Sequence, residues 1–122
     1  PNYIYLSASF KGIKKDKNEI KKEIDHLKKR KEITQPSRIK TGGSTFKNPS
    51  DQTSDKAWEL IKKSIPKNKT LGDATISEKH CNFVVNKGNA TFNDMLKLVQ
   101  FIEKEVKLKT GIKIETEIEI LK

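Results

Sequence analysis

Two kinds of apolar periodicity follow one another in the last third of the chain, and together they constrain its fold class most strongly. Between Thr91 and Gly111 one apolar stripe recurs at helical spacing: Met95, Leu98, Val99, Ile102 and Val106. Thr91 with Asp94 is typical of a capping box, and Gly111 is typical of a helix C-terminus. Residues 112–121 then alternate strictly between apolar and charged residues, which predicts a half-buried strand.

The alternating segment has one face for the core and one for solvent. The inward face is Ile112, Ile114, Thr116, Ile118 and Ile120, and the outward face is Lys113, Glu115, Glu117 and Glu119. This pattern alone assigns Glu117 to a solvated surface. A long helix followed by such a strand indicates an α+β domain rather than an all-helical one.

The remaining predicted elements are shorter. Strands are expected at residues 3–10, 71–76 and 82–86, and helices at 17–31 and 55–63. Trp58, in the second of these helices, is expected in the core. The fold class is therefore α+β, a small and mostly antiparallel sheet packed against helices, preceded by a strand and a lysine-rich helix. A strand at the first residues of a chain lacks a preceding partner, which indicates a piece of a longer protein.

The charge of the chain favours an anionic partner. It has 26 Lys and Arg against 16 Asp and Glu, a net charge of +10. Its only arginines are Arg30 and Arg38, whereas bidentate contacts to guanine and phosphate usually come from arginine. Aromatic residues do not alternate with the basic ones as a stacking platform requires. We expect a small, multiply anionic ligand, with a non-catalytic basic module for nucleotides or RNA as the alternative.

Other compositional features exclude several classes of protein. Cys81 is the single cysteine, so no internal disulfide can form. Because His26 and His80 are the only histidines, no metal site is expected, and His26 lies on the polar face of its helix. No apolar run approaches the roughly 20 residues of a membrane span, and the first residues do not resemble a signal peptide. We expect a cytoplasmic protein without a membrane partner.

Residues 42–49, Gly-Gly-Ser-Thr-Phe-Lys-Asn-Pro, concentrate most of the polar chemistry. Glycines allow positive φ and a close approach to a ligand, so Ser44 is presented there. Lys47 and Asn48 are residue types that bind phosphate and amide or carbonyl groups. The same residues also suit an ordinary Gly-Gly turn, and the loop alone leaves both interpretations open.

Four sequence blocks, of which this loop is the first, resemble the C-terminal region of the UDP-N-acetylenolpyruvoylglucosamine reductase family, the MurB flavoenzymes. The blocks are residues 42–49, 56–61, 71–86 and 115–118, and they occur in the family's order at nearly the family's spacing. The resemblance extends from about residue 8 to the end. It implies that residues 1–33 are the strand and connecting helix that close the FAD-binding region. Residues 34–122 would then be the C-terminal substrate-binding domain.

The resemblance also implies a reaction and its residues. In this family, FAD and NADPH reduce UDP-N-acetylglucosamine enolpyruvate to UDP-N-acetylmuramate for peptidoglycan synthesis. Ser44 is implied as the proton donor. Glu117 is implied as the group that stabilises the intermediate, provided that burial keeps it protonated. This reverses the assignment of Glu117 from periodicity.

The nucleotide contacts follow by the same resemblance. Lys67 would lie near the diphosphate, and Asn48 and His80 would make polar contacts to the nucleotide. Lys47 would support the loop or remain solvated. The FAD-binding region of the same enzyme is implied as a partner, and the enzyme is expected to be a monomer.

The chain departs from the family pattern at several places. It contains no glycine-rich pyrophosphate loop, so by itself it is expected to bind no FAD and to be inactive. The segment 50–55 is longer than in the family. Ser64, Ile65, Pro66 and Asn68 replace an alanine and glycines, and Asp73 replaces a small residue. A carboxylate near a diphosphate would oppose binding.

Overall fold

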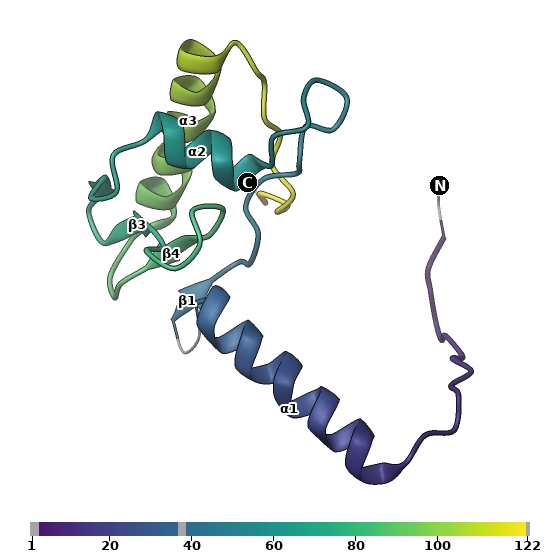
Figure 1. The fold of residues 1–122 in the computed structure, drawn as a ribbon. Helices are drawn as coiled ribbons and strands as arrows, with labels where there is room; N and C mark the ends of the chain where they lie inside the picture. The colour runs from purple at the N-terminus through teal and green to yellow at the C-terminus, as the bar shows by residue number, and fades with distance from the viewer. Residues whose placement is uncertain (1–2, 37–38, 122) are drawn as a thin grey trace. The chain divides into compact units, whose positions relative to one another are not determined.

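The structure is a computed structural model that describes residues 3–36 and 39–121 (Figure 1). The chain divides into two compact units, Pro1–Lys31 and Glu32–Lys122.

The first unit holds most of helix α1 (Lys17–Thr34), which begins where predicted. Its N-terminus is capped by Asp16, whose Oδ1 accepts hydrogen bonds from the backbone N–H groups of Asn18 and Glu19 at 2.9 and 3.2 Å. No residue of α1 is buried, and His26 is exposed as predicted.

The predicted strand at residues 3–10 is wrong. These residues have no regular secondary structure and all are exposed, Phe10 by 95%. The described residues contain no strand that pairs with this segment, and an isolated strand has no stability of its own.

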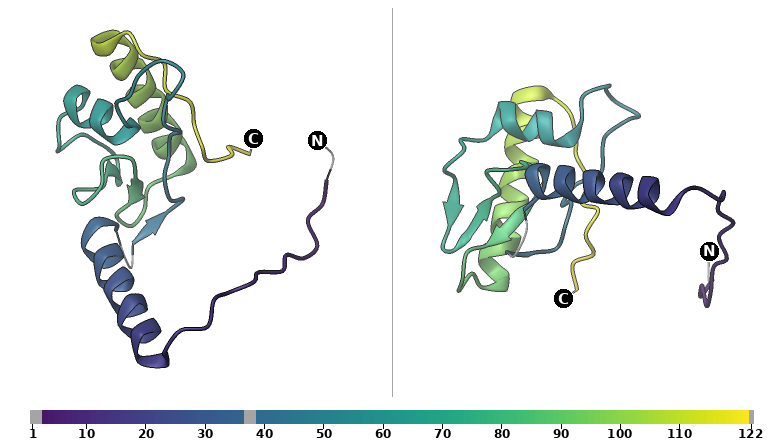
Figure 2. Two further views of the ribbon diagram at one scale, coloured as in Figure 1. Left: turned by 45° about the vertical axis from the view of Figure 1, so that its right-hand side comes forward. Right: turned by 60° about the horizontal axis from the view of Figure 1, so that its bottom comes forward.

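The second unit contains the antiparallel sheet. Its strands are β1 (Lys40–Thr41), β2 (Thr70–Leu71), β3 (Ala74–Ile76) and β4 (Val84–Asn86), in the spatial order β1-β4-β3-β2. Helix α3 (Phe92–Thr110) contacts β2, β3 and β4, and helix α2 (Ala57–Ser64) packs on α3. Figures 1 and 2 show α2 crossing α3 beside the strands. The α+β prediction is confirmed.

The strand predicted at residues 71–76 is two strands. Gly72 has φ of +54°, in the left-handed region that favours glycine, so the chain turns between β2 and β3. The strand predicted at 82–86 is shorter, because Asn82 and Phe83 belong to the preceding turn.

Helix α3 carries the core as its sequence predicts. Leu98, Val99, Ile102 and Val106 are buried, while Met95 is only partly buried and packs against the core. Thr91 Oγ1 accepts from Asp94 N–H, and the Asp94 carboxylate accepts from Thr91 N–H, which completes the capping box. The buried residues that join this stripe come from every layer: Phe46, Ala57, Leu60, Ile61, Ile65, Ala74, Ile76, Val84 and Ile114. The prediction that Trp58 lies in the core is wrong, since this residue is 38% exposed.

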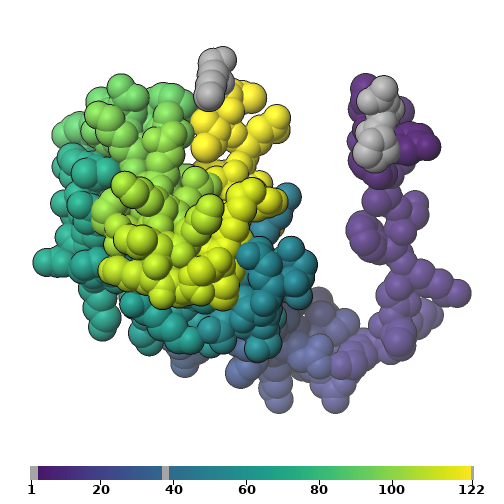
Figure 3. Space-filling view, turned by 90° about the horizontal axis from the view of Figure 1, so that it is seen from above, coloured from purple at the N-terminus to yellow at the C-terminus, as the bar shows by residue number. Residues whose placement is uncertain are grey.

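The terminal segment, residues 112–121, forms one isolated bridge instead of the predicted strand. Thr116 pairs with Phe46 in an antiparallel bridge, and no ladder extends from it within the described residues. The predicted alternation of burial remains, since Ile114 is buried while Glu115 and Glu117 are exposed. Figure 3 shows this segment at the surface beside α3.

Candidate functional site

The serine loop, residues 42–49, is anchored directly after Ser44. Gly43 has φ of +91°, and a side chain there would meet no atom within 4 Å. Thr45 is buried, donates from its backbone N–H to the Asn82 carbonyl at 2.7 Å, and accepts from Val84 N–H at its Oγ1. Ser44 is half-buried, and its hydroxyl has no hydrogen-bond partner in the part of the chain that the structure describes. The loop therefore holds the serine in place while leaving its hydroxyl available.

The terminal segment lies directly against this loop. Lys47 N–H donates to the Glu115 carbonyl, and Glu117 N–H donates to the Thr45 carbonyl, both at 2.8 Å. Phe46 and Thr116 form the non-hydrogen-bonded pair between these two bonds. The fold thus places the backbone of Glu117 beside the residue that follows Ser44, although the two segments are far apart in sequence. The Glu117 side chain is exposed.

Asn82 is the residue that holds the loop to the sheet, and sequence reasoning missed it. Its Oδ1 accepts from Phe46 N–H at 2.9 Å, and its Nδ2 donates to the Phe46 carbonyl at 2.8 Å. The side chain therefore pairs with Phe46 as a neighbouring strand would. The available signal in the sequence was a polar asparagine just before the apolar residues of β4. The sequence could not show its partner, Phe46, because the two residues are distant along the chain.

His80 is fixed by a backbone hydrogen bond and by aromatic contacts. Its Nδ1 accepts from Asn82 N–H at 3.2 Å, and its ring lies edge-on to Phe83 and Trp58 with centroids 4.9 and 6.4 Å apart. Burial lowers the pKa of His80, against a smaller opposing effect of a backbone hydrogen bond. Because Nδ1 is an acceptor, the neutral ring carries its proton on Nε2.

Asn48 and the two predicted lysines occupy different surroundings. Asn48 Oδ1 accepts from Ala57 N–H at 3.0 Å, so its side chain satisfies the first turn of α2. Lys47 and Lys67 are exposed. Lys67 lies in the turn after α2, where Lys69 N–H donates to the Pro66 carbonyl. No hydrogen bond or ion pair within residues 3–36 and 39–121 joins Lys67 to the serine loop.

Asp73 has a structural partner. Its Oδ2 accepts from Asn89 N–H at 2.8 Å, and its carbonyl accepts from Lys87 N–H at 2.9 Å. The carboxylate therefore ties the β2–β3 turn to the loop before α3.

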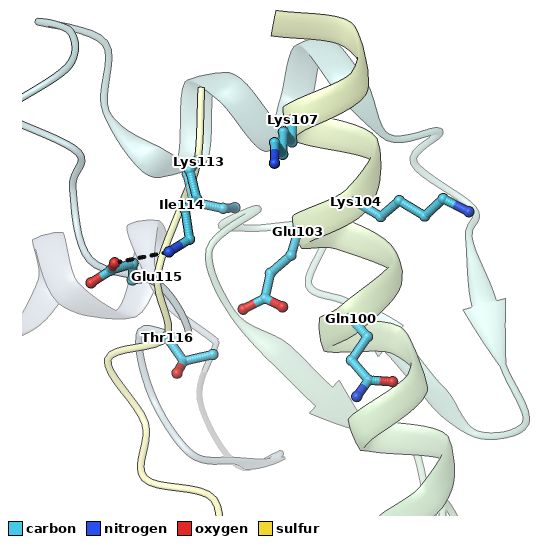
Figure 4. Close-up of a pocket in the computed structure, with 8 residues that line it drawn as sticks. All are labelled: Gln100, Glu103, Lys104, Lys107, Lys113, Ile114, Glu115 and Thr116. Carbon is cyan, nitrogen blue, oxygen red and sulfur yellow. Dashed lines mark hydrogen bonds and ion pairs between the residues drawn. The ribbon is translucent and has the colours of Figure 1, made fainter. Parts of the chain in front are cut away.

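A separate groove lies between α3 and the terminal segment (Figure 4). Its volume is about 560 Å³, and its lining is Gln100, Glu103, Lys104, Lys107, Lys113, Ile114, Glu115 and Thr116. Burial raises the pKa of Glu103, and the charge of Lys113 acts in the opposite direction. No residue proposed from the sequence lines this groove.

Neither a metal centre nor a membrane-spanning helix occurs in the described ranges. There, no group of three or more His, Cys, Asp and Glu side chains could hold a metal ion. No helix there is long and apolar enough to cross a bilayer.

The sheet order, the two packed helices and the loop bonded to the terminal segment define a particular class of α+β domain. A crystal structure of UDP-N-acetylenolpyruvylglucosamine reductase (MurB) from Thermus caldophilus shares this fold with a TM-score of 0.67. It is 34% identical, over 88% of this chain and 36% of that one. Residues 35–121 match the family model for the C-terminal domain of UDP-N-acetylenolpyruvoylglucosamine reductase. The chain belongs to this family.

Two curated relatives bear the same reductase name. The protein of Pelagibacter ubique (strain HTCC1062) is 60% identical over 119 residues, which are 98% of this chain and 39% of the relative. The protein of Beijerinckia indica subsp. indica is 39% identical over 115 residues, 94% of this chain and 36% of the relative. The chain therefore spans less than half the length of the relatives that it matches.

Proposed function

We propose that this chain is the substrate-binding C-terminal part of a flavin- and NADPH-dependent UDP-N-acetylenolpyruvoylglucosamine reductase, which makes UDP-N-acetylmuramate for peptidoglycan. Residues 34–122 would form the substrate-binding domain, and residues 1–33 would close the FAD-binding region. The observation that carries the proposal is the hydrogen bond from Glu117 N–H to the Thr45 carbonyl. It brings together the two segments that would supply the catalytic groups.

Ser44 would complete the reduction as a general acid. In the full-length reductase, FAD already reduced by NADPH would supply the hydride for one carbon of the enolpyruvyl double bond. The Ser44 hydroxyl would give its proton to the neighbouring carbon, so that the double bond gains one hydrogen at each end and Ser44 is left as an alkoxide. A serine hydroxyl is a weak acid and protonates only a strongly basic carbon. The free hydroxyl of Ser44, held between Gly43 and the buried Thr45, suits this role.

Glu117 would act on the substrate carboxylate. A protonated carboxyl group can donate a hydrogen bond where a carboxylate would repel. The Glu117 side chain is exposed in this chain, so bound substrate or the rest of the reductase would have to cover it for this role.

The nucleotide would be held by polar and cationic groups around this centre. His80 would donate from Nε2–H, Asn48 would use its amide nitrogen, and Lys67 with Lys47 would offset the diphosphate charge. These assignments rest on the family resemblance together with the exposure of both lysines. The sequence has no glycine-rich pyrophosphate loop, and we expect the chain alone to bind no FAD and to catalyse no reduction.

Titration of the 122-residue chain with UDP-N-acetylglucosamine, followed by amide NMR, tests substrate binding. We expect saturable shifts at Ser44, Lys67 and His80. Shifts elsewhere only, or none, would contradict the proposal. Absent nucleotide shifts with RNA binding that weakens steeply with salt would support the basic module, which the net charge of +10 favours.

Kinetics of the full-length reductase test the catalytic roles. Ser44→Ala and Glu117→Gln should each lower kcat by about a hundredfold or more, as losses of catalytic groups do. FAD absorbance should stay unchanged in both variants. Turnover equal to the parent in either variant would refute the role of that residue.

A further inference from the structure

We infer that Asn82 is a positioning residue for this reaction, which holds the Ser44 loop in register with the Glu117 segment. The inference rests on the proposed roles of Ser44 and Glu117. Asn82 itself lies in the turn before β4 and reaches the site only through the backbone of the serine loop.

All four polar groups of Asn82 have partners in the structure. The side chain binds the N–H and the carbonyl of Phe46, the backbone carbonyl accepts from Thr45, and the backbone N–H donates to His80 Nδ1. Asn82 is 6% exposed and Phe46 is 1% exposed. Water can therefore replace few of these bonds, and losing a partner leaves a buried polar group unpaired.

The chemistry of the amide explains why asparagine stands here. One oxygen accepts and one nitrogen donates, which matches the N–H and carbonyl of Phe46. An aspartate keeps the shape and the acceptor, but it faces the Phe46 carbonyl with a second oxygen. Asn82→Asp therefore removes the hydrogen bond to the Phe46 carbonyl with little change in side-chain shape, and so tests the link between the sheet and the serine loop.

On the side away from Asn82, the segment around Phe46 pairs with the terminal segment of the chain. Thr45 and Lys47, its two neighbours, carry the backbone bonds to Glu117 and Glu115. Asn82 therefore fixes Phe46, the middle one of the three residues, 45–47, through which the serine loop binds the Glu117 segment. Because a displacement of about 1 Å at a reacting group can cost a hundredfold in rate, loosening this link should lower kcat.

Asn86 offers a matched control. It lies on β4, and its Oδ1 accepts from Gly88 and Ala90 N–H while its Nδ2 donates to the Ala90 carbonyl. This is the same kind of side-chain clamp, but on the loop before α3. Asn86→Asp and Asn82→Asp remove the same donor from two different loops.

The first measurement is steady-state kinetics of the full-length reductase. We expect Asn82→Asp to lower kcat at least about tenfold with KM changed less than about twofold, the signature of misplaced catalytic groups. Asn86→Asp should keep kcat close to the parent value. Equal kcat in the two variants would overturn the inference.

The second measurement is amide exchange in the 122-residue chain, which requires no activity. Asn82→Asp should speed exchange of the Phe46, Thr45 and Glu117 amides, and Asn86→Asp should speed that of Gly88 and Ala90. If Asn82→Asp does not fold, Asn82→Ser, whose shorter side chain carries a hydroxyl instead of the amide, is measured in the same way. Unchanged exchange at Phe46 and Glu117 would overturn the inference.

The two measurements separate this inference from the proposed function. Faster exchange at Phe46 with unchanged kcat would overturn the positioning role and leave the role of Ser44 intact. Full activity of Ser44→Ala would instead refute the proposed function, whatever Asn82 does.

Discussion

At the scale of single residues, Ser64 contains an unsatisfied polar atom. In the described part of the chain, its Oγ is the only buried side-chain nitrogen or oxygen without a hydrogen-bond partner. Ser64→Ala should raise the free energy of unfolding by about 1 kcal/mol, because alanine removes the unsatisfied hydroxyl and favours the helix. Urea unfolding followed by circular dichroism measures this.

Ser50→Ala is the control for Ser64→Ala. Ser50 is exposed, so its replacement should change the free energy of unfolding by less than about 0.5 kcal/mol. A Ser64→Ala variant less stable than the parent would show that the hydroxyl has a partner in solution.

His80 should make stability depend on pH. Burial lowers its pKa in the folded state below the ordinary 6.5, so the unfolded chain binds more protons just below pH 6.5. The His80 contribution is therefore complete above pH 6.5 and is lost as pH falls through 6.5 toward the folded pKa. Protonation also removes the Nδ1 acceptor used by Asn82 N–H.

Urea unfolding at several pH values between about 5 and 8 measures this dependence. This pH range lies above the usual pKa values of carboxylates. His80→Gln should flatten the curve in this window. An NMR titration of His80 with a midpoint above 6.5 would contradict the prediction.

The position of Ser44 in a loop could be predicted from the sequence because a local motif carries it, and the loop is anchored at the next residue, Thr45. Asn82 could not, because its bonds join segments that are distant in sequence. Asn48 shows a different difficulty: the motif predicts a nucleotide contact, and the structure shows its oxygen bonded to Ala57 N–H. A polar residue in a motif can bind a ligand, support the fold, or do both.

At the scale of elements, the β2–β3 turn depends on Gly72. Its φ is +54°, and a Cβ there would lie 3.1 Å from the Asp94 carboxylate that completes the cap of α3. Gly72→Ala should lower the free energy of unfolding by about 1–2 kcal/mol, because alanine is strained at positive φ and crowds the cap. Thermal melting measures the loss.

Gly12→Ala is the matched control for Gly72→Ala. A Cβ at Gly12 meets no atom within 4 Å, so the melting temperature should not fall. Equal melting temperatures of the two variants would contradict the role of the turn.

The helices should differ in local stability. Helix α1 buries no residue, whereas α3 buries four, and most of the stability of a protein helix comes from packing of its apolar face. Amides of α1 should therefore exchange roughly a hundredfold faster than those around Ile102. Hydrogen exchange measured by NMR distinguishes the two, and equal protection would contradict the prediction.

Local signals explain which elements were predicted well. The cap, the apolar stripe and the terminal glycine of α3 lie within one stretch of chain, and the helix forms where they predict it. The terminal segment has the period of a strand, but a ladder needs a partner strand, and among the described residues only 45–47 pair with this segment. Residues 3–10 have strand-forming residues and no partner in the described structure, so propensity alone misled.

At the scale of the whole molecule, the net charge of +10 should make stability depend on salt. Like charges repel one another more strongly in the compact state, and salt screens that repulsion. The melting temperature should therefore rise as NaCl increases from about 20 to 200 mM, over which the screening length falls from roughly 20 to 7 Å. Circular dichroism melting measures the shift.

KCl at the same ionic strength is the control, since screening does not depend on which of these salts is used. A melting temperature that falls with salt would show that attractive pairs such as Lys63–Asp55, at 2.8 Å, outweigh the general repulsion.

The family of the chain can be read from four short blocks, because their order and spacing are linear properties. The way in which these blocks come together in space is not a property of their order and spacing along the chain. The serine loop, the turn at Asn82 and the segment at Glu117 meet only after the chain has closed its sheet, and no periodicity describes such a meeting.

The partly exposed Trp58 has a practical consequence. It is the only tryptophan of the chain, and its ring lies 6.4 Å from His80 and 5.8 Å from Lys62 Nζ. The tryptophan fluorescence of the chain therefore arises from one place, next to a residue proposed to contact the nucleotide. A ligand that displaces water there should change the emission of this indole, and the unlabelled chain would report its own binding.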